Sequence, residues 1–154
     1  MGLWSEREKR GIIISGFAGI GKTGFLEHFP EYRNKKVFDL TSTHFRKNEG
    51  WEKFYCDLIE SVSKEYDYVF VSTHNTVISE LISRGVKFYI VYPKHYCRDE
   101  YIERFVKRGS SEEYIKKFYK NWDYFISMLE NVKHENKIEL RTGQYLSDVI
   151  ARLR

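Results

Sequence analysis

The chain has 154 residues, a length that suits one compact domain. Hydrophobic residues make up 42% of it and charged residues 31%, with ten glycines and two prolines, which excludes a disordered, collagen-like or low-complexity polypeptide. Lys and Arg number 26 against 22 Asp and Glu, and they form no long basic run. This mild excess favours small anionic partners, and nucleic acid is not expected among them.

The apolar stretches of the sequence are short, and their length bears on where the protein is located. None approaches the roughly 18 residues needed to cross a bilayer, and the charged first ten residues contain no apolar segment of a secretory signal. We therefore expect no membrane association and a cytoplasmic location. The two cysteines, Cys56 and Cys97, form no C-x-x-C pair, which predicts a reduced protein without a zinc site.

In the first half of the chain, short β-like runs alternate with longer helical ones. A buried strand is expected over residues 12–15, a helix over 21–29 that stops before Pro30, and a second strand over 36–40. Hydrophobic residues then recur at steps of three and four, which predicts a helix with a core-facing stripe made of Trp51, Phe54, Tyr55, Leu58, Ile59 and Val62.

The second half repeats this alternation. Strands are expected over residues 68–71, 86–92 and 137–140, and helices through 77–82, 101–106, 114–129 and 145–153. Gly109 is the expected end of one helix, and residues 110–113 have the capping-box spacing, from Ser110 to Glu113, for the start of the next. Five strands alternating with helices predict a single domain, a three-layer α/β sandwich with a mainly parallel sheet.

Residues 16–23 match the P-loop pattern G-x-x-x-x-G-K-[ST] at every fixed position, between an expected strand and an expected helix. Gly16 and Gly21 allow successive backbone N–H groups to turn toward a phosphate. Lys22 is expected to reach the β- and γ-phosphates of ATP, and the Thr23 hydroxyl to ligate Mg²⁺. The same nucleotide site includes three residues inside the loop: Ala18, Gly19 and Ile20. The alternative is a glycine-rich turn with an incidental lysine.

Four segments resemble the small P-loop kinases of the nucleoside monophosphate kinase superfamily, which is adenylate kinase-like, and in particular compact kinase-like proteins encoded by bacteriophages. They are residues 13–23, 38–42, 69–74 and 100–109. The resemblance implies the strand order 2-3-1-4-5, an acceptor-binding insert at about residues 41–64 and an arginine-bearing lid at about residues 95–125. It also places Gln144 in the segment where related kinases wrap the adenine ring.

Two arginines fit the implied lid. Arg104 and Arg108 are four residues apart and share a helix face, so both guanidinium groups could close over a triphosphate and spread the charge of the transition state. The alternative is a solvated helix face on which Glu100 and Glu103 pair with them.

The expected acceptor side starts from Asp39, at the carboxyl end of the second strand. Asp39 could anchor the acceptor, hold a Mg²⁺-bound water or take a proton, or it could simply form a turn. Further candidates for acceptor binding are Ser42, Arg46, Thr73 and His74. His74 could serve as a base or as a helix cap. The third strand ends without an acid, so the aspartate that many P-loop proteins use for Mg²⁺ is missing from its usual place.

These residues predict an ATP-dependent phosphotransferase acting on a small acceptor, with a nucleoside monophosphate favoured. In an alternative interpretation the acceptor is a small molecule with a hydroxyl group, and Asp39 is its base. In another the protein is a regulatory nucleotide-binding module with little turnover. A polynucleotide end kinase ranks below these, because it should carry a stronger basic stripe.

Overall fold

The computed structural model describes residues 10–22, 34–40 and 47–153. Its five strands form one parallel sheet in the order β2-β3-β1-β4-β5. The strands are β1 (Ile12–Gly16), β2 (Val37–Leu40), β3 (Tyr68–Val71), β4 (Tyr89–Pro93) and β5 (Lys137–Leu140). The predicted α/β class and strand order are confirmed.

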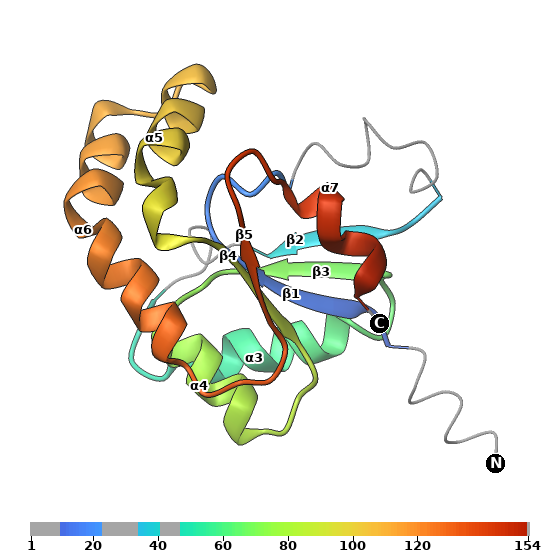
Figure 1. Cartoon of the computed structure of the whole chain (residues 1–154). Coiled ribbons are helices and arrows are strands. Elements are labelled where there is room, and N and C mark those ends of the chain that lie inside the picture. The colour runs from blue at the N-terminus through green and yellow to red at the C-terminus, as the bar shows by residue number, and fades with distance from the viewer. Residues whose placement is uncertain (1–9, 23–33, 41–46, 154) are drawn as a thin grey trace, which may run out of the picture.

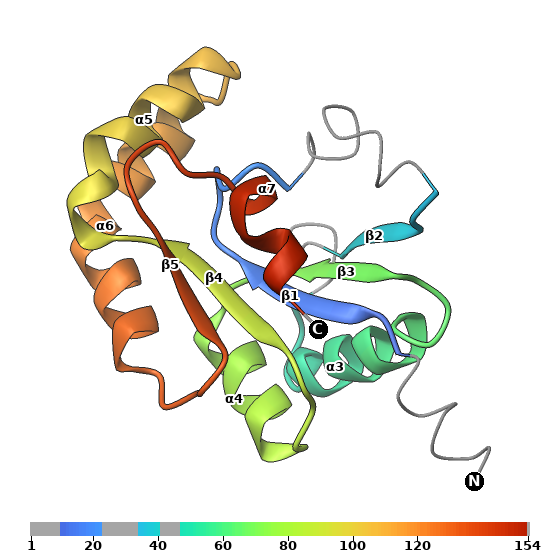
Figure 2. The same ribbon diagram turned by 45° about the vertical axis from the view of Figure 1, so that its right-hand side comes forward.

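Helices lie on both faces of the sheet (Figures 1 and 2). On one face lie α3 (Trp51–Val62) and α4 (Asn75–Ser83), and on the other lies α7 (Leu146–Val149) with the 3₁₀ turn η4 (Ile150–Arg152). From the carboxyl end of β4 the chain enters a second 3₁₀ turn, η3 (His95–Cys97), and then the adjacent helices α5 (Arg98–Lys107) and α6 (Glu112–Asn131). The helix expected over residues 21–29 lies outside the described residues beyond Lys22. None of the helices described is both long and apolar enough to span a bilayer.

The central strand β1 sets the place of the site. It pairs with β3 on one side and β4 on the other, and its Ile13, Ile14 and Ser15 are buried. Burial on both faces explains the continuous isoleucine run. The buried Ser15 hydroxyl is satisfied because it donates a hydrogen bond to the Ser72 carbonyl at 2.8 Å. Because β2 and β3 lie on one side of β1 and β4 and β5 on the other, the direction of strand succession reverses at β1, and a crevice is expected at its carboxyl end, where open α/β sheets bind ligands.

Of the two helix boundaries expected between α5 and α6, the end at Gly109 is confirmed, whereas α6 begins one residue later than the spacing from Ser110 to Glu113 indicates. Gly109, with φ at +80°, follows the end of α5, and the next N–H, of Ser110, donates back to the Phe105 carbonyl at 3.0 Å. Ser111 caps α6, because its hydroxyl accepts from the N–H of Tyr114 at 3.1 Å. The α5–α6 pair therefore has ends defined by local chemistry.

The stripe expected on α3 is only partly core. Tyr55, Cys56, Ile59 and Val62 are buried, but Phe54 is 69% exposed and Leu58 37%. At 3.6 residues per turn, Phe54 lies roughly 160° around the helix from Cys56, so both cannot face the sheet and α4. Two other boundaries also differ: β4 begins at Tyr89 rather than at residue 86, and the expected closing helix divides into α7 and η4.

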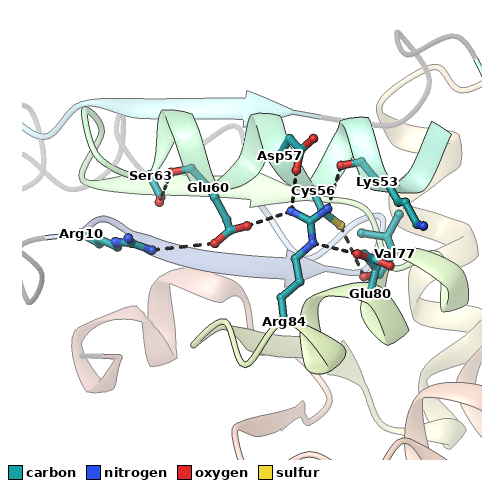
Figure 3. A network of polar contacts seen from close by, with 9 residues as sticks. All are labelled: Arg10, Lys53, Cys56, Asp57, Glu60, Ser63, Val77, Glu80 and Arg84. Atoms are coloured by element: carbon teal, nitrogen blue, oxygen red, sulfur yellow. Dashed lines mark hydrogen bonds and ion pairs between the residues drawn. The ribbon is translucent and has the colours of Figure 1, made fainter. Parts of the chain in front are cut away.

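A charged network fixes α3 against α4 (Figure 3). The Arg84 guanidinium donates to Asp57, Glu60 and Glu80, each at 2.8 Å, and to the carbonyl of Lys53 at 3.1 Å. Hydrogen bonds to the three carboxylates raise the pKa of Arg84 above its already high ordinary value. Arg10, just before β1, also pairs with Glu60 at 4.0 Å, so the network supports the layer under the sheet at the amino end of β1, away from the crevice at its carboxyl end.

Candidate active site

The residues after β1 form a tight bend. Phe17 anchors it by donating its N–H to the Val91 carbonyl at 2.9 Å. Gly19 and Gly21 have φ values of +86° and +95°, a region that favours glycine, and a Cβ on Gly16 would lie 2.8 Å from Cδ1 of Ile20. The backbone therefore favours glycine at two positions of the loop, and a side chain at Gly16 would crowd Ile20. Such a bend is suited to gather backbone N–H groups around a phosphate.

Lys22 lies across this bend, where its Nζ donates to the Gly16 carbonyl at 3.0 Å. Burial lowers the pKa of Lys22, the Asp39 carboxylate opposes that change, and the Arg108 guanidinium adds to it. Residues from β2 and from the end of α5 thus act on the charge of one lysine. A polyphosphate in the bend would offer Nζ a stronger partner than a carbonyl and favour its charged form.

The two lid arginines have different environments. Arg108 is exposed and donates to the Ser110 hydroxyl and the Tyr114 hydroxyl, both at 2.9 Å. Arg104 is half-buried, and its guanidinium donates to the carbonyls of Gly19 at 2.8 Å and Gln144 at 3.0 Å. It also pairs with Glu100 at 2.5 Å, which is the pairing expected in the alternative interpretation of this helix face. Closure of both arginines over a triphosphate stays a prediction.

Tyr55 aligns the strand ends on the acceptor side. Its buried hydroxyl donates to the Leu40 carbonyl and accepts from the N–H of Ser72 at 3.3 Å. Burial raises the pKa of Tyr55, which keeps the proton that this donor role needs. The ends of β2 and β3 are therefore tied together, and Asp39, exposed on β2 in register with Phe70, lies at the same edge.

His74 follows β3 at the N-cap position of α4, but its side chain makes no capping hydrogen bond. Nδ1 lies 2.9 Å from the Ser72 hydroxyl and Nε2 lies 3.2 Å from Nζ of Lys47. Burial lowers the pKa of His74, and Lys47 and Lys117 lower it further, so the neutral ring is favoured. Because an ammonium can only donate, Nε2 accepts from Lys47 and Nδ1 carries the proton. In this arrangement neither nitrogen is a ready base.

A cavity of about 270 Å³ lies between the start of α4 and α6. Thr73 and His74 line it together with Phe17 of the P-loop and Lys117 of α6. Much of the remaining lining is aromatic, from Phe118, Tyr124 and Phe125. Two residues predicted to bind the acceptor thus share a cavity with the loop predicted to bind ATP.

Three predicted site residues, Thr23, Ser42 and Arg46, lie outside the described residues. Across the ranges that the structure describes, no group of three or more His, Cys, Asp or Glu residues could hold a metal ion. Mg²⁺ commonly binds through one or two protein oxygens together with substrate phosphates and water, so the residues present fit a Mg²⁺–nucleotide held mainly through its phosphates.

Three contacts of this site had no signal strong enough to predict them. The Arg104 bonds to Gly19 and Gln144 span 85 and 40 positions of the chain, so they depend on how α5 packs. The Lys47–His74 contact joins two loops. The Glu100–Arg104 pair, by contrast, was visible as an i, i+4 spacing.

Comparison with known proteins identifies the fold. No protein-family model matches the chain, and no match was found among curated proteins. Fourteen chains of solved structures match it. A gluconokinase from Sinorhizobium meliloti 1021 has a TM-score of 0.50 at 14% identity, covering 93% of this chain and 88% of its own. An uncharacterized protein from Eubacterium ventriosum ATCC 27560 has a TM-score of 0.50 at 12% identity, covering 94% and 97%.

A third match is a shikimate kinase from Bacteroides thetaiotaomicron, with a TM-score of 0.44 at 18% identity, covering 79% of this chain and 77% of its own. At such identities the likeness concerns the fold alone. The strand order and the bend after β1 agree with it, and the chain therefore has the fold of a P-loop kinase.

Proposed function

We propose that the protein is an ATP-dependent phosphotransferase that moves the γ-phosphoryl group of ATP to a small acceptor. The observation that carries this proposal is the glycine-dependent bend at the carboxyl end of β1, with Nζ of Lys22 across it and a cavity beside it. Phosphoryl transfer requires mainly that the protein align the two reactants and stabilise the charge of the transition state. Such a site can do both without a nucleophilic side chain.

Each residue has a stated role in this proposal. The backbone of residues 16–22 holds the phosphates of ATP, Lys22 meets their negative charge, and Thr23 would ligate Mg²⁺. When they are bound, ATP supplies the phosphoryl group and Mg²⁺ supplies part of the positive charge that neutralises the phosphates. Arg108, exposed and already within electrostatic reach of Lys22, is the lid residue placed to approach the transferring group.

We favour a nucleoside monophosphate as the acceptor. The aromatic side chains that line the cavity suit a flat ring, and Lys117 at its wall suits an anionic group. A phosphate acceptor is already ionised and needs no strong base, which agrees with the occupied nitrogens of His74. Within this proposal residues 41–64 are the acceptor insert, residues 95–125 are the lid, and the resemblance to bacteriophage-encoded kinases and a cytoplasmic location remain predictions.

A second candidate is a kinase of a small hydroxyl compound with Asp39 as the base. Asp39 favours it, because its carboxylate is exposed at the carboxyl edge and acts on the charge of Lys22. The similarity in fold to a gluconokinase is compatible with it. The two candidates differ in whether transfer requires a proton acceptor on the protein.

A phosphotransfer screen tests the proposal. The full chain is incubated with ATP and Mg²⁺ and with each common ribo- and deoxynucleoside monophosphate, and in parallel with gluconate, and products are separated by anion-exchange chromatography. We expect a nucleoside diphosphate, and we expect Lys22→Ala to reduce turnover by roughly a hundredfold or more. Lys107→Ala is the matched control, because its exposed side chain pairs with Glu103 at 3.1 Å on the outside of α5.

The outcomes separate the candidates. If the acceptor is a hydroxyl compound, Asp39→Asn abolishes transfer and leaves ATP affinity nearly unchanged. Absence of transfer to every acceptor by folded protein, or equal turnover in Lys22→Ala and Lys107→Ala, would contradict the proposed function.

A further inference from the structure

A groove continues from the cavity beside the P-loop. It has a volume of about 550 Å³ and lies between α4 and the carboxyl end of α6, which are neighbours in both views of the ribbon (Figures 1 and 2). Asn75 and Met128 line the groove and the cavity alike, so the two hollows adjoin. The cavity alone, at about 270 Å³, is smaller than the roughly 300–1,000 Å³ of ordinary ligand sites, whereas the two hollows together fall within that range.

The surface of the groove combines apolar and hydrogen-bonding groups. Four apolar side chains line it, those of Ile78, Ile82, Met128 and Val132. Three polar residues, Asn75, Ser79 and Ser83, are exposed at steps of four along α4, so they share one face of the helix and can hydrogen bond to a molecule in the groove. This face extends over about 12 Å of the helix. The groove therefore suits a ligand with both apolar and polar parts.

The combined hollow has a positive charge in each of its two parts. Lys117 lines the cavity, and Lys133, which follows α6, lines the groove. Both residues are exposed, and the helix carries the chain roughly 20 Å from Lys117 to its end at Asn131. Within the described part of the chain, no acidic residue lines either hollow. A ligand that fills both parts would therefore be stabilised by two anionic groups, one toward each end.

We propose that the acceptor is longer than one nucleoside monophosphate: a nucleotide joined to a second unit that ends in an anionic group, as in a dinucleotide with a terminal phosphate. Its 5′-nucleotide occupies the cavity beside the P-loop, and its second unit lies in the groove with the terminal anion at Lys133. An oxygen of the 5′-phosphate forms the new bond to the γ-phosphorus of ATP, the bond from that phosphorus to the β,γ-bridging oxygen breaks, and ADP leaves with the electron pair. The proposal rests on the proposed function, because it concerns the acceptor of the same transfer.

The test compares acceptors of increasing length, with the full chain at saturating ATP and Mg²⁺. The probes are the deoxynucleoside 5′-monophosphates, the 5′-phosphorylated dinucleotides of the same bases, those dinucleotides with an added 3′-phosphate, and gluconate. We expect kcat/KM to rise by about tenfold or more from the mononucleotide to the dinucleotide with the 3′-phosphate. Lys133→Ala should lower kcat/KM by about two- to fivefold, and only for the probe with the 3′-phosphate, as expected for an exposed charge pair.

Ser79→Trp fills the groove from an exposed position of α4. It should lower kcat/KM for the longest probe by about tenfold or more, and so remove the advantage of that probe over the mononucleotide. Ser61→Trp is the matched control, because Ser61 is also an exposed serine within a helix, on α3, and lines neither hollow. The advantage of the longest probe should persist in this control.

The outcomes separate this inference from the proposed function. A dinucleotide that is used no better than the mononucleotide, or equal effects of Ser79→Trp and Ser61→Trp, overturns the inference, while transfer to the mononucleotide preserves the proposed function. Transfer to gluconate alone also overturns the inference and leaves the phosphotransferase in place. If folded protein transfers a phosphoryl group to none of the probes, both proposals fail together.

Discussion

The space around Gly19 allows the geometry of the phosphate-binding bend to be tested by adding one methyl group. With φ at +86°, alanine at this position would be strained by about 1–2 kcal/mol. Its Cβ would also lie 2.9 Å from Cε1 of Phe105 and 3.1 Å from Cδ2 of Tyr101, which are fully buried and have little room to move. Overpacking of this kind costs about 1–3 kcal/mol. Gly19→Ala should therefore lower the free energy of unfolding by roughly 2–5 kcal/mol.

Gly85→Ala is the matched control, because Gly85 has φ at +68° and nothing lies within 4 Å of a Cβ built on it. It should lower the free energy of unfolding by about 1–2 kcal/mol through backbone strain alone. Urea denaturation followed by tryptophan fluorescence measures both variants, and nucleotide binding should weaken only in Gly19→Ala. Equal destabilisation of the two variants would refute the packing of α5 against the bend.

Two further predictions concern protons at the site. The lowered pKa of Lys22 predicts that nucleotide binding weakens with rising pH before the ordinary lysine range is reached. Asp39→Asn should move that weakening to lower pH and Arg108→Ala to higher pH in titrations of the dissociation constant, and shifts in one common direction would contradict the assigned contacts. Because the folded protein disfavours protonated His74, the unfolded chain binds that proton more readily, and this residue makes the free energy of unfolding fall as pH drops below about 6.5. Lys47→Met should raise the pKa of His74 in an NMR titration, and an unchanged midpoint would show that Lys47 does not act on it.

The sequence was most informative where one local pattern decides the structure. A continuous apolar run predicted β1, and glycine spacing predicted the bend that follows it. Gly109 marked a helix end that the structure confirms, and the serines that follow it marked the start of the next helix to within one residue. In each case the physical cause lies within a few residues of the chain. The strand order was supplied by resemblance to a family, since spacing alone leaves several orders open.

The sequence was least informative where distant elements decide the structure. Phe54 and Leu58 fit the stripe of α3 by spacing, but the helix packs on a narrower face and leaves them exposed. The bonds of Arg104 to the Gly19 and Gln144 carbonyls had no signal in the sequence, although its role above a triphosphate stays a prediction. Apart from the i, i+4 pair of Arg104 with Glu100, these contacts have no local cause, because each depends on which surface a helix meets after folding.

A crystal structure with Mg²⁺ and ADP would test most directly whether the bend from Gly16 to Lys22 binds polyphosphate. We predict that the β-phosphate accepts from the N–H groups of the bend and that Nζ of Lys22 leaves the Gly16 carbonyl to meet it. Nucleotide bound instead in the cavity lined by Arg10 and Lys87 at the opposite edge of the sheet, with Lys22 still on Gly16, would contradict that prediction.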